Sequence, residues 1–125
     1  MDKLEEAKGL LRQIGMPQKQ QGVLCSLTLL AMAGLKRESR WSDATNEWIR
    51  IHDIMSFIAN NYDVIYAENS RETFRKQAMH PFRTAALIED NGMATNSPNY
   101  RYRLTKEFLD VIRDVSDNHD CVAEP

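Results

Sequence analysis

The sequence predicts a mostly α-helical domain that ends in a two-stranded β-hairpin and one last helix. Three observations lead to this fold class. Apolar residues recur at helical spacing through most of the first 85 positions, two short strand-like runs follow, and clusters of turn-forming residues separate the segments. With 125 residues, 42% of them hydrophobic, the chain suffices for one buried core. We therefore expect a single domain of about five helices over residues 1–116, and a polar, disordered tail over 117–125.

Three helices are predicted before residue 62. The first is amphipathic, because apolar residues recur three and four positions apart at Leu4, Ala7, Leu11 and Ile14. Gly15 and Pro17 end this helix. The second, over residues 18–35, is apolar on nearly every side, which favours the buried centre of the domain, with Gly34 as its stop. The third is expected over residues 52–61, closed by Asn60 and Asn61.

The connector over residues 36–50 is polar and irregular, and it carries two tryptophans. An aromatic side chain in a connector usually packs over an edge of the core, so we expect this for Trp41 and Trp48. Stacking on a nucleic-acid base is the alternative. The connector is therefore expected to close the core rather than to form a further element.

The fourth helix is predicted over Ser70 to His80 and is basic. Asn69 and Glu72 have the spacing of a capping box at its start. Its buried face is expected to consist of Phe74, Ala78, Phe82 and Ala85. Pro81 has no amide hydrogen to donate to Gln77, so the regular helix is expected to bend or stop near His80. The side chains that point away from the buried face are Thr73, Lys76, His80 and Arg83. Arg71 and Arg75 lie on its flank.

A hairpin and a last helix complete the order of elements. The strands are expected at residues 87–88 and 100–104, with turns at Asn91-Gly92 and Asn96-Ser97-Pro98. Alternation along the second strand places Tyr100, Tyr102 and Leu104 on one face and Arg101 and Arg103 on the other. Thr105 is expected to cap the last helix, whose apolar stripe is Phe108, Ile112 and Val115. This order is that of a winged helix-turn-helix, with the hairpin as its wing.

Positive charge is concentrated in the basic helix and the wing. Residues 70–106 contain seven Lys or Arg and three acidic residues, a balance of +4. The remainder contains nine basic and fifteen acidic residues, a balance of −6, and the two balances together give the net charge of −2. The modest overall charge therefore conceals a polarised molecule.

The polarised charge and the order of elements predict duplex DNA as the partner. In a winged helix-turn-helix the second helix of the motif enters the major groove. An arginine there can donate two hydrogen bonds to guanine, worth ~1–3 kcal/mol of discrimination, and Gln77 can do the same for adenine. From the wing, Arg101, Arg103 and Lys106 are expected to contact phosphate. The candidate DNA-binding residues are Arg71, Thr73, Arg75, Lys76, Gln77, Arg83, Asn96, Ser97, Arg101 and Arg103. The alternative for the helical residues is that they form only a solvated face. The alternative for Asn96 and Ser97 is that they only form a turn.

No catalytic or metal-binding constellation is predicted. His80 is expected to contact solvent or phosphate, His52 and Asp53 to cap a helix, and His119 to belong to too loose a cluster in the tail. The run of Glu6, Ala7 and Lys8 matches half of a nuclease pattern by chance, because it lies on an amphipathic helix. The chain alone is therefore expected to be non-catalytic and to need no cofactor.

The sequence also points to a reduced, cytoplasmic setting. Cys25 and Cys121 are far apart and form no CxxC motif, so Cys25 is expected to be a small buried residue and Cys121 an unengaged thiol. The longest apolar run, over residues 23–35, is shorter than the ~20 residues of a membrane span. No export signal follows the charged first residues.

Several blocks in a fixed order carry a family resemblance: residues 7–17, 20–21, 27–31, 66–73, 75–77, 80–82, 85–87 and 96–98. Over roughly residues 5–105 the chain resembles the N-terminal helix-turn-helix domain of the BsuBI/PstI family of type II restriction endonucleases. It departs from the family pattern at Gly22, Pro81 and Ala86, where Asn, a helix former and Gly are usual, and in a shorter spacer between Leu87 and Asn96. These departures bear on where the wing lies.

The resemblance implies a DNA-binding domain that a Mg²⁺-dependent nuclease domain follows, in a homodimer on a palindromic hexanucleotide such as CTGCAG. It implies binding roles for Arg71, Thr73, Arg75, Lys76 and Gln77, and it implies that the catalytic residues lie beyond Pro125. The alternatives are a freestanding winged-helix transcriptional regulator and a protein interaction module whose basic face meets an acidic partner.

Overall fold

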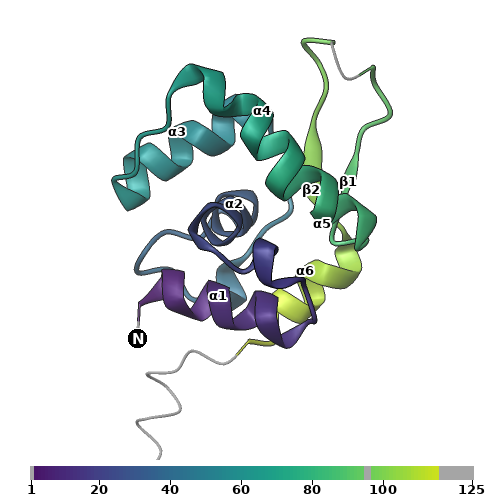
Figure 1. Cartoon of the computed structure of the whole chain (residues 1–125). Coiled ribbons are helices and arrows are strands. Elements are labelled where there is room, and N and C mark those ends of the chain that lie inside the picture. Colours follow the sequence, from purple (N-terminus) through teal and green to yellow (C-terminus); the bar gives the residue numbers. More distant parts are fainter. Residues whose placement is uncertain (1, 95–96, 116–125) are drawn as a thin grey trace, which may run out of the picture.

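The computed structural model describes residues 2–94 and 97–115, and it confirms a mostly helical winged helix-turn-helix fold (Figure 1). Asn96 and the expected tail, with His119 and Cys121, lie outside the described residues. The helices are α1 (Lys3–Gln13), α2 (Val23–Ala33), α3 (Ile51–Tyr62), α4 (Arg71–Phe74), α5 (His80–Thr84) and α6 (Lys106–Arg113). A π-helical segment, η4 (Arg75–Met79), joins α4 to α5 in one continuous helix, which we call the long helix. The strands are β1 (Ile88–Asp90) and β2 (Tyr102–Leu104).

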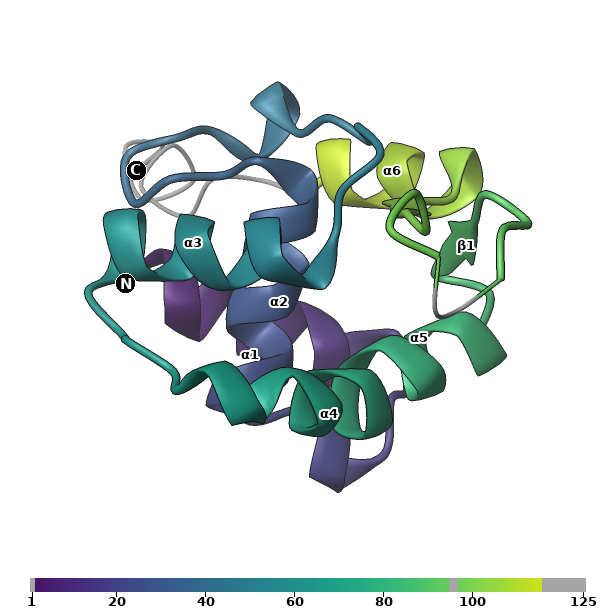
Figure 2. The same cartoon turned by 90° about the horizontal axis from the view of Figure 1, so that it is seen from above.

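Helix α2 is the centre of the core, as predicted. Every residue from Cys25 to Ala33 is buried, and α1, α3 and the long helix surround α2 (Figures 1 and 2). The predicted start at residue 18 is wrong, because Gln18–Gln20 form a separate 3-10 turn and the extended backbone of Gly22 interrupts the helix before Val23. The helix ends at Gly34, whose φ of +69° is accessible to a residue without a side chain.

Helix α3 is one residue longer at each end than predicted. Asp53 accepts a hydrogen bond from the Arg50 backbone amide (3.2 Å) at its start, which confirms the capping role of this carboxylate. At the other end the chain leaves the helix at Asp63, with φ of +60°, rather than at Asn60 and Asn61. The Asn61 side chain instead donates to the carbonyl of Phe57 within the helix (3.0 Å). That bond satisfies a helical carbonyl without ending the helix.

The predicted capping box at the start of the long helix is wrong. A 3-10 turn, Glu68–Ser70, precedes α4, and Ser70 is the N-cap residue, with helical dihedral angles and no side-chain cap bond. The carboxylate of Glu72 binds Arg75 on the following turn instead of reaching back to Asn69. Ala85 was expected on the buried face, but it is the exposed C-cap of α5, and Met79 is buried in its place.

The long helix continues through Pro81, so the prediction that it stops near His80 is wrong, but a π-helical segment interrupts its regular α-helical pattern just before that residue. The backbone amide of His80 donates to Arg75, five residues back, so the helix is locally wider where Pro81 follows. The carbonyl of Gln77, to which an ordinary residue 81 would donate, accepts a hydrogen bond from the buried thiol of Cys25 (3.1 Å). The proline is therefore accommodated by a π-helical segment and by a side-chain donor from α2.

The wing is an antiparallel pair in which Ile88 lies opposite Leu104, and Asp90 opposite Tyr102. Both strands differ from their predicted limits. Ile49 adds an isolated antiparallel bridge to Tyr102, with backbone bonds of 2.8 and 2.9 Å, so the connector lies against the free edge of β2. Thr105 caps α6 by accepting from the amide of Phe108 (3.3 Å), as predicted.

The two tryptophans of the connector differ. Trp41 is fully buried, as predicted, and its indole donates to Glu6 (2.8 Å). Trp48 is 41% exposed, so the prediction that it packs over the core is wrong. Because neighbours in an extended segment point to opposite sides, the half-buried Ile49 leaves Trp48 facing outward, where Arg103 lies 4.2 Å from its ring. Within the described residues, no helix is long and apolar enough to cross a membrane.

Candidate nucleic-acid interface

A groove of about 560 Å³ lies between the start of α3, the start of the long helix and the wing. We call it the α4 groove. The two helices contribute Arg50, His52, Arg71, Glu72 and Arg75 to its lining. The wing contributes Ser97, Pro98 and Tyr100 to the opposite wall. Of the predicted site residues, the fold thus brings together Arg71, Arg75 and Ser97.

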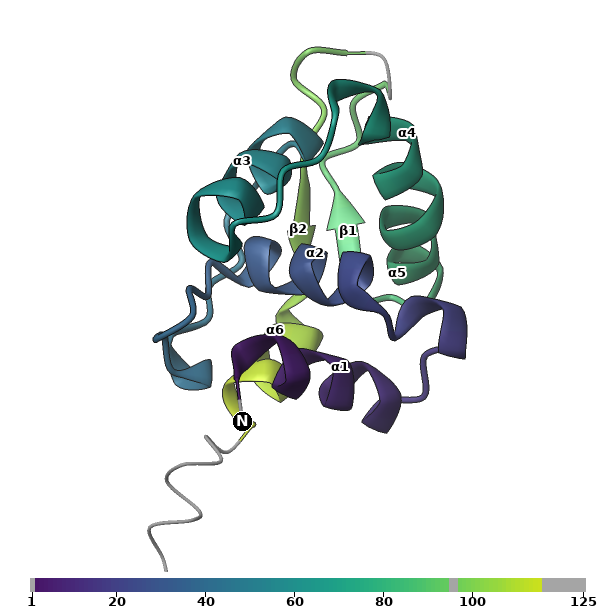
Figure 3. The same ribbon diagram turned by 60° about the vertical axis from the view of Figure 1, so that its left-hand side comes forward.

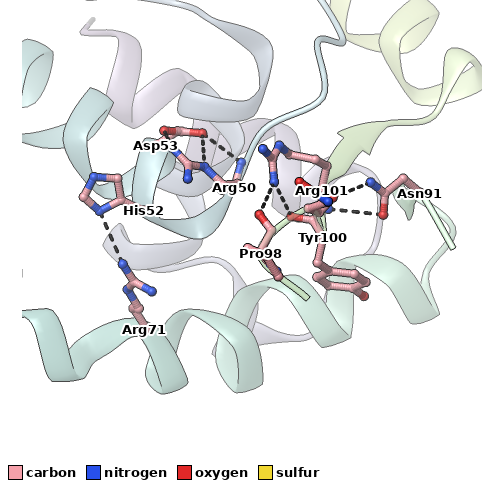
Figure 4. Close-up of polar contacts among 9 residues, drawn as sticks. Arg50, His52, Asp53, Arg71, Asn91, Pro98, Tyr100 and Arg101 are labelled. Atoms are coloured by element: carbon pink, nitrogen blue, oxygen red, sulfur yellow. Dashed lines mark hydrogen bonds and ion pairs between the residues drawn. The ribbon is translucent and has the colours of Figure 1, made fainter. Parts of the chain in front are cut away.

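Arg71 connects the two helices that border the groove. Its guanidinium lies 2.6 Å from the carboxylate of Glu68 and 3.4 Å from Nδ1 of His52 (Figure 4). Because an arginine only donates hydrogen bonds, Nδ1 of His52 is the acceptor in this contact. The expected capping role of His52 is therefore wrong; its ring faces α4 instead.

Arg75 is held by Glu72 in a two-point contact. The distances are 3.3 Å from Nε to Oε1 and 2.5 Å from Nη2 to Oε2. This hydrogen-bonded pair holds the pKa of Glu72 below its ordinary value, so the carboxylate is charged at neutral pH. Arg75 also borders a smaller cavity of about 130 Å³ beneath the wing tyrosines. It therefore lies at the junction of the long helix and the wing.

The other helical candidates lie outside the α4 groove. Thr73, Lys76 and Gln77 are exposed on the surface of the long helix, and so is His80. Arg83 is exposed at the end of this helix and pairs with Asp90 of β1 (3.0 Å). The candidates therefore form two groups, one inside the groove and one on the neighbouring helical surface.

The guanidinium groups of the wing bond within the wing itself. Arg101 donates to the carbonyls of Pro98 (2.9 Å) and Tyr100 (3.1 Å), as Figure 4 shows. Arg103 pairs with Glu89, its cross-strand neighbour, at 2.7 Å. Lys106, which was expected to accompany them, pairs with Asp110 on α6 (3.2 Å). Arg101, Arg103 and Lys106 thus bond to neighbouring groups of the protein, instead of simply pointing outward as the alternation along the strand suggested.

Ser97 and Tyr100 shape the wall that the wing adds to the groove. Ser97 accepts a hydrogen bond from the amide of Asn99 (3.1 Å), so it forms the turn and also lines the groove. The hydroxyl of Tyr100 donates to Asp90 (3.1 Å), and its ring packs edge-on against Tyr102 at 4.9 Å. Burial raises the pKa of Tyr102, which stays a neutral phenol.

Sequence reasoning missed seven of the ten residues that line the groove: Arg50, Ile51, His52, Glu72, Pro98, Tyr100 and Tyr102. The signal that could have found Arg50 and His52 is their place at the start of α3, since first-turn residues of one helix can face the next helix of a helix-turn-helix. Chemically, guanidinium groups gathered in one concavity suit phosphates or the acceptor-rich edge of guanine. Among the described residues, no group of three or more His, Cys, Asp or Glu could hold a metal ion.

Comparisons with known proteins agree with one another. Residues 1–120 match the model of the BsuBI/PstI restriction endonuclease HTH domain. The chain is 35% identical over 114 residues to the type II restriction enzyme BsuBI of Bacillus subtilis. It is 29% identical over 113 residues to the type II restriction enzyme AplI of Arthrospira platensis, and each alignment covers 88% of this chain.

The solved structure of the SdaI restriction endonuclease is similar over 96% of this chain, with a TM-score of 0.86 and 30% identity. The chain spans 36% and 35% of the two curated relatives and 39% of the SdaI chain. Sequence and structure thus agree over nearly the whole chain, and this chain belongs to the family of BsuBI/PstI restriction endonuclease helix-turn-helix domains.

Proposed function

We propose that this chain binds duplex DNA and serves as the DNA-recognition domain of a type II restriction endonuclease. The observation that carries the proposal is the α4 groove, in which Arg50 and His52 of α3 meet Arg71 and Arg75 of the long helix beside the wing. The names of the relatives, all restriction enzymes, support the same function.

Two groups of residues have different roles in this proposal. One group is exposed along the first turns of the long helix and enters the major groove: Arg71, Thr73, Arg75, Lys76 and Gln77. Phosphate contacts fall to Arg83, Asn96, Ser97, Arg101 and Arg103. Arg103 pairs with the exposed carboxylate of Glu89, and exposed ion pairs are worth only ~0–1 kcal/mol, so a DNA phosphate can replace this carboxylate.

Strand cleavage belongs, in this proposal, to the part of the restriction enzymes that the match does not cover. That part would hold the Mg²⁺ ion that the family resemblance implies. No step of the cleavage reaction is assigned to the residues of this chain. The proposal includes a single DNA-binding domain over residues 1–116, a tail over 117–125, a homodimer on a palindromic CTGCAG-like site, and a cytoplasmic enzyme.

The site is tested by the double variant Arg75→Ala/Lys76→Ala. Its affinity for duplex DNA, measured by fluorescence anisotropy at low and at physiological salt, is expected to fall on the order of tenfold or more, because two cations leave the interface. The matched control is Lys8→Ala/Arg12→Ala, which removes the same charge from α1, at the opposite end of the molecule from the tip of the wing (Figure 3). Equal affinities of the two variants would contradict the assignment of the long helix.

Three further observations separate the alternatives. Absence of binding to any duplex at low salt would exclude both DNA-binding functions and leave a protein interaction module. Enrichment of CTGCAG among duplexes selected from a random pool would support the restriction enzyme. A coding sequence that continues past Pro125 into a nuclease domain would support it too, and a stop codon there would favour a freestanding regulator.

A further inference from the structure

Glu72 is the one carboxylate among the described residues that line the α4 groove. The other titratable residues there are Arg50, His52, Arg71, Arg75, Tyr100 and Tyr102. The carboxylate is half exposed and lies against Arg75. A groove built for phosphate alone gains nothing from a fixed negative charge, because a carboxylate and a phosphate repel each other.

Helix stability does not explain why this carboxylate lies in the groove. The Glu72–Arg75 pair is exposed, and such pairs three residues apart contribute little. An acidic residue at the start of the long helix is favourable, but Glu68 already stands there and pairs with Arg71 at 2.6 Å. Glu68 does not line the groove. The two glutamates thus make the same kind of pair, and they differ in where the carboxylate lies.

The hydrogen-bonding capacity of the Glu72–Arg75 pair is only partly used. An arginine has five N–H donors, and Glu72 takes one from Nε and one from Nη2. Three donors of Arg75 remain. The ionised carboxylate has about four acceptor positions, of which Arg75 occupies one on each oxygen. Both partners can therefore bind a further group without breaking the pair, and each holds the other in place.

We propose that Glu72 and Arg75 act together as a base-reading pair, an inference that rests on the proposed DNA binding. Arg75 donates to the acceptors of a guanine in the major groove, and Glu72 accepts from the exocyclic amino group of a neighbouring cytosine or adenine. A thymine or guanine presents an acceptor in place of that amino group and is rejected by the carboxylate. Glu72 is thus a specificity-determining residue.

The test compares the wild-type chain with Glu72→Ala and with the matched control Glu68→Ala. Preferred duplexes are selected from a random pool, and affinities are then measured on the preferred duplex and on duplexes with one base changed. Two analogues remove a single amino group: 2-pyrimidinone in place of cytosine and purine in place of adenine. Circular dichroism establishes that each variant is folded.

The wild-type chain is expected to lose affinity on the order of tenfold when the amino group is removed at one position of the site. The Glu68→Ala variant is expected to lose the same factor, and the Glu72→Ala variant, which has no acceptor at this position, is expected to be insensitive there. Which analogue has the effect identifies the base as cytosine or adenine.

Three outcomes would overturn the inference while leaving DNA binding intact: Glu72→Ala keeps the wild-type preference, both variants bind every duplex more tightly by one common factor, or the wild-type chain has no sequence preference. The common factor would mean that the carboxylates only repel phosphate. Absence of any binding by the wild-type chain would instead contradict the proposed function itself, and the inference with it.

Discussion

The two sides of the long helix differ in the interactions that their side chains make. On the core side, Phe74, Ala78, Met79 and Phe82 are at most 1% exposed, and the ring of Phe74 packs edge-on against Tyr66 at 4.9 Å. On the other side, exposed arginines pair with exposed carboxylates. Burial of a large apolar side chain contributes about 1.5–3 kcal/mol, whereas an exposed ion pair contributes ~0–1 kcal/mol. The core side therefore stabilises the helix, and the groove side is free to be selected for binding.

The largest effect is expected from Phe74→Ala, which removes the centre of the core side. The free energy of unfolding should fall by about 3–5 kcal/mol, because a fully buried ring is replaced by a cavity. Urea denaturation followed by circular dichroism measures it. The control is the neighbouring exposed residue in Thr73→Ala, for which a change within about 0.5 kcal/mol is expected. Similar losses in the two variants would break the distinction between the sides.

A smaller effect is expected from ionisation of the Cys25 thiol, which donates to the carbonyl of Gln77 in the long helix. Burial raises the pKa of Cys25 from 9.0 to about 11. Because the folded state favours the protonated thiol, this stabilisation is fully present below pH 9 and is lost as the pH rises toward 11. The expected loss is roughly 2–3 kcal/mol.

The measurement for Cys25 is the free energy of unfolding at pH 8 and at pH 11, for the wild-type chain and for Cys25→Ala. Burial also raises the pKa of Tyr62 and of Tyr102, so both proteins should lose stability at high pH. The wild-type chain should lose more. An equal loss in the two proteins would mean that the thiol is not held protonated against Gln77.

The smallest effect is expected from Ala86→Gly, just after the end of the long helix. Ala86 has φ of +63°, a left-handed conformation that costs a residue with a side chain roughly 1–2 kcal/mol, while glycine adopts it freely at some cost in chain entropy. Since the methyl group is exposed, the variant should be more stable by about 1 kcal/mol. Thermal unfolding measures this gain. DNA affinity should not change, and a change in affinity would show that residue 86 positions the wing.

The sequence predicts the core side better than the groove side. Period and capping patterns predicted α1, α3 and α6, and the buried positions Phe74, Ala78 and Phe82 followed from the apolar spacing of the long helix. Three local rules failed at this helix: the capping box at Asn69, the break at Pro81 and the burial of Ala85. The carboxylate of Glu72 binds Arg75 instead of the start of the helix, and Cys25 from α2 donates to the carbonyl that Pro81 leaves without its usual donor. Ala85 is exposed because the helix ends there.

By itself the sequence determined the fold class, the buried centre in α2 and the family, because apolar periodicity and blocks of residues are local properties of the chain. Only the tertiary structure decided that Cys25 donates to Gln77 across 52 positions and that His52 faces Arg71 across 19. It also decided that Arg103 lies between Glu89 and Trp48. The partner of a side chain depends on which elements the packed core brings within a few ångströms of it. That distance cannot be read from the spacing of residues along the chain.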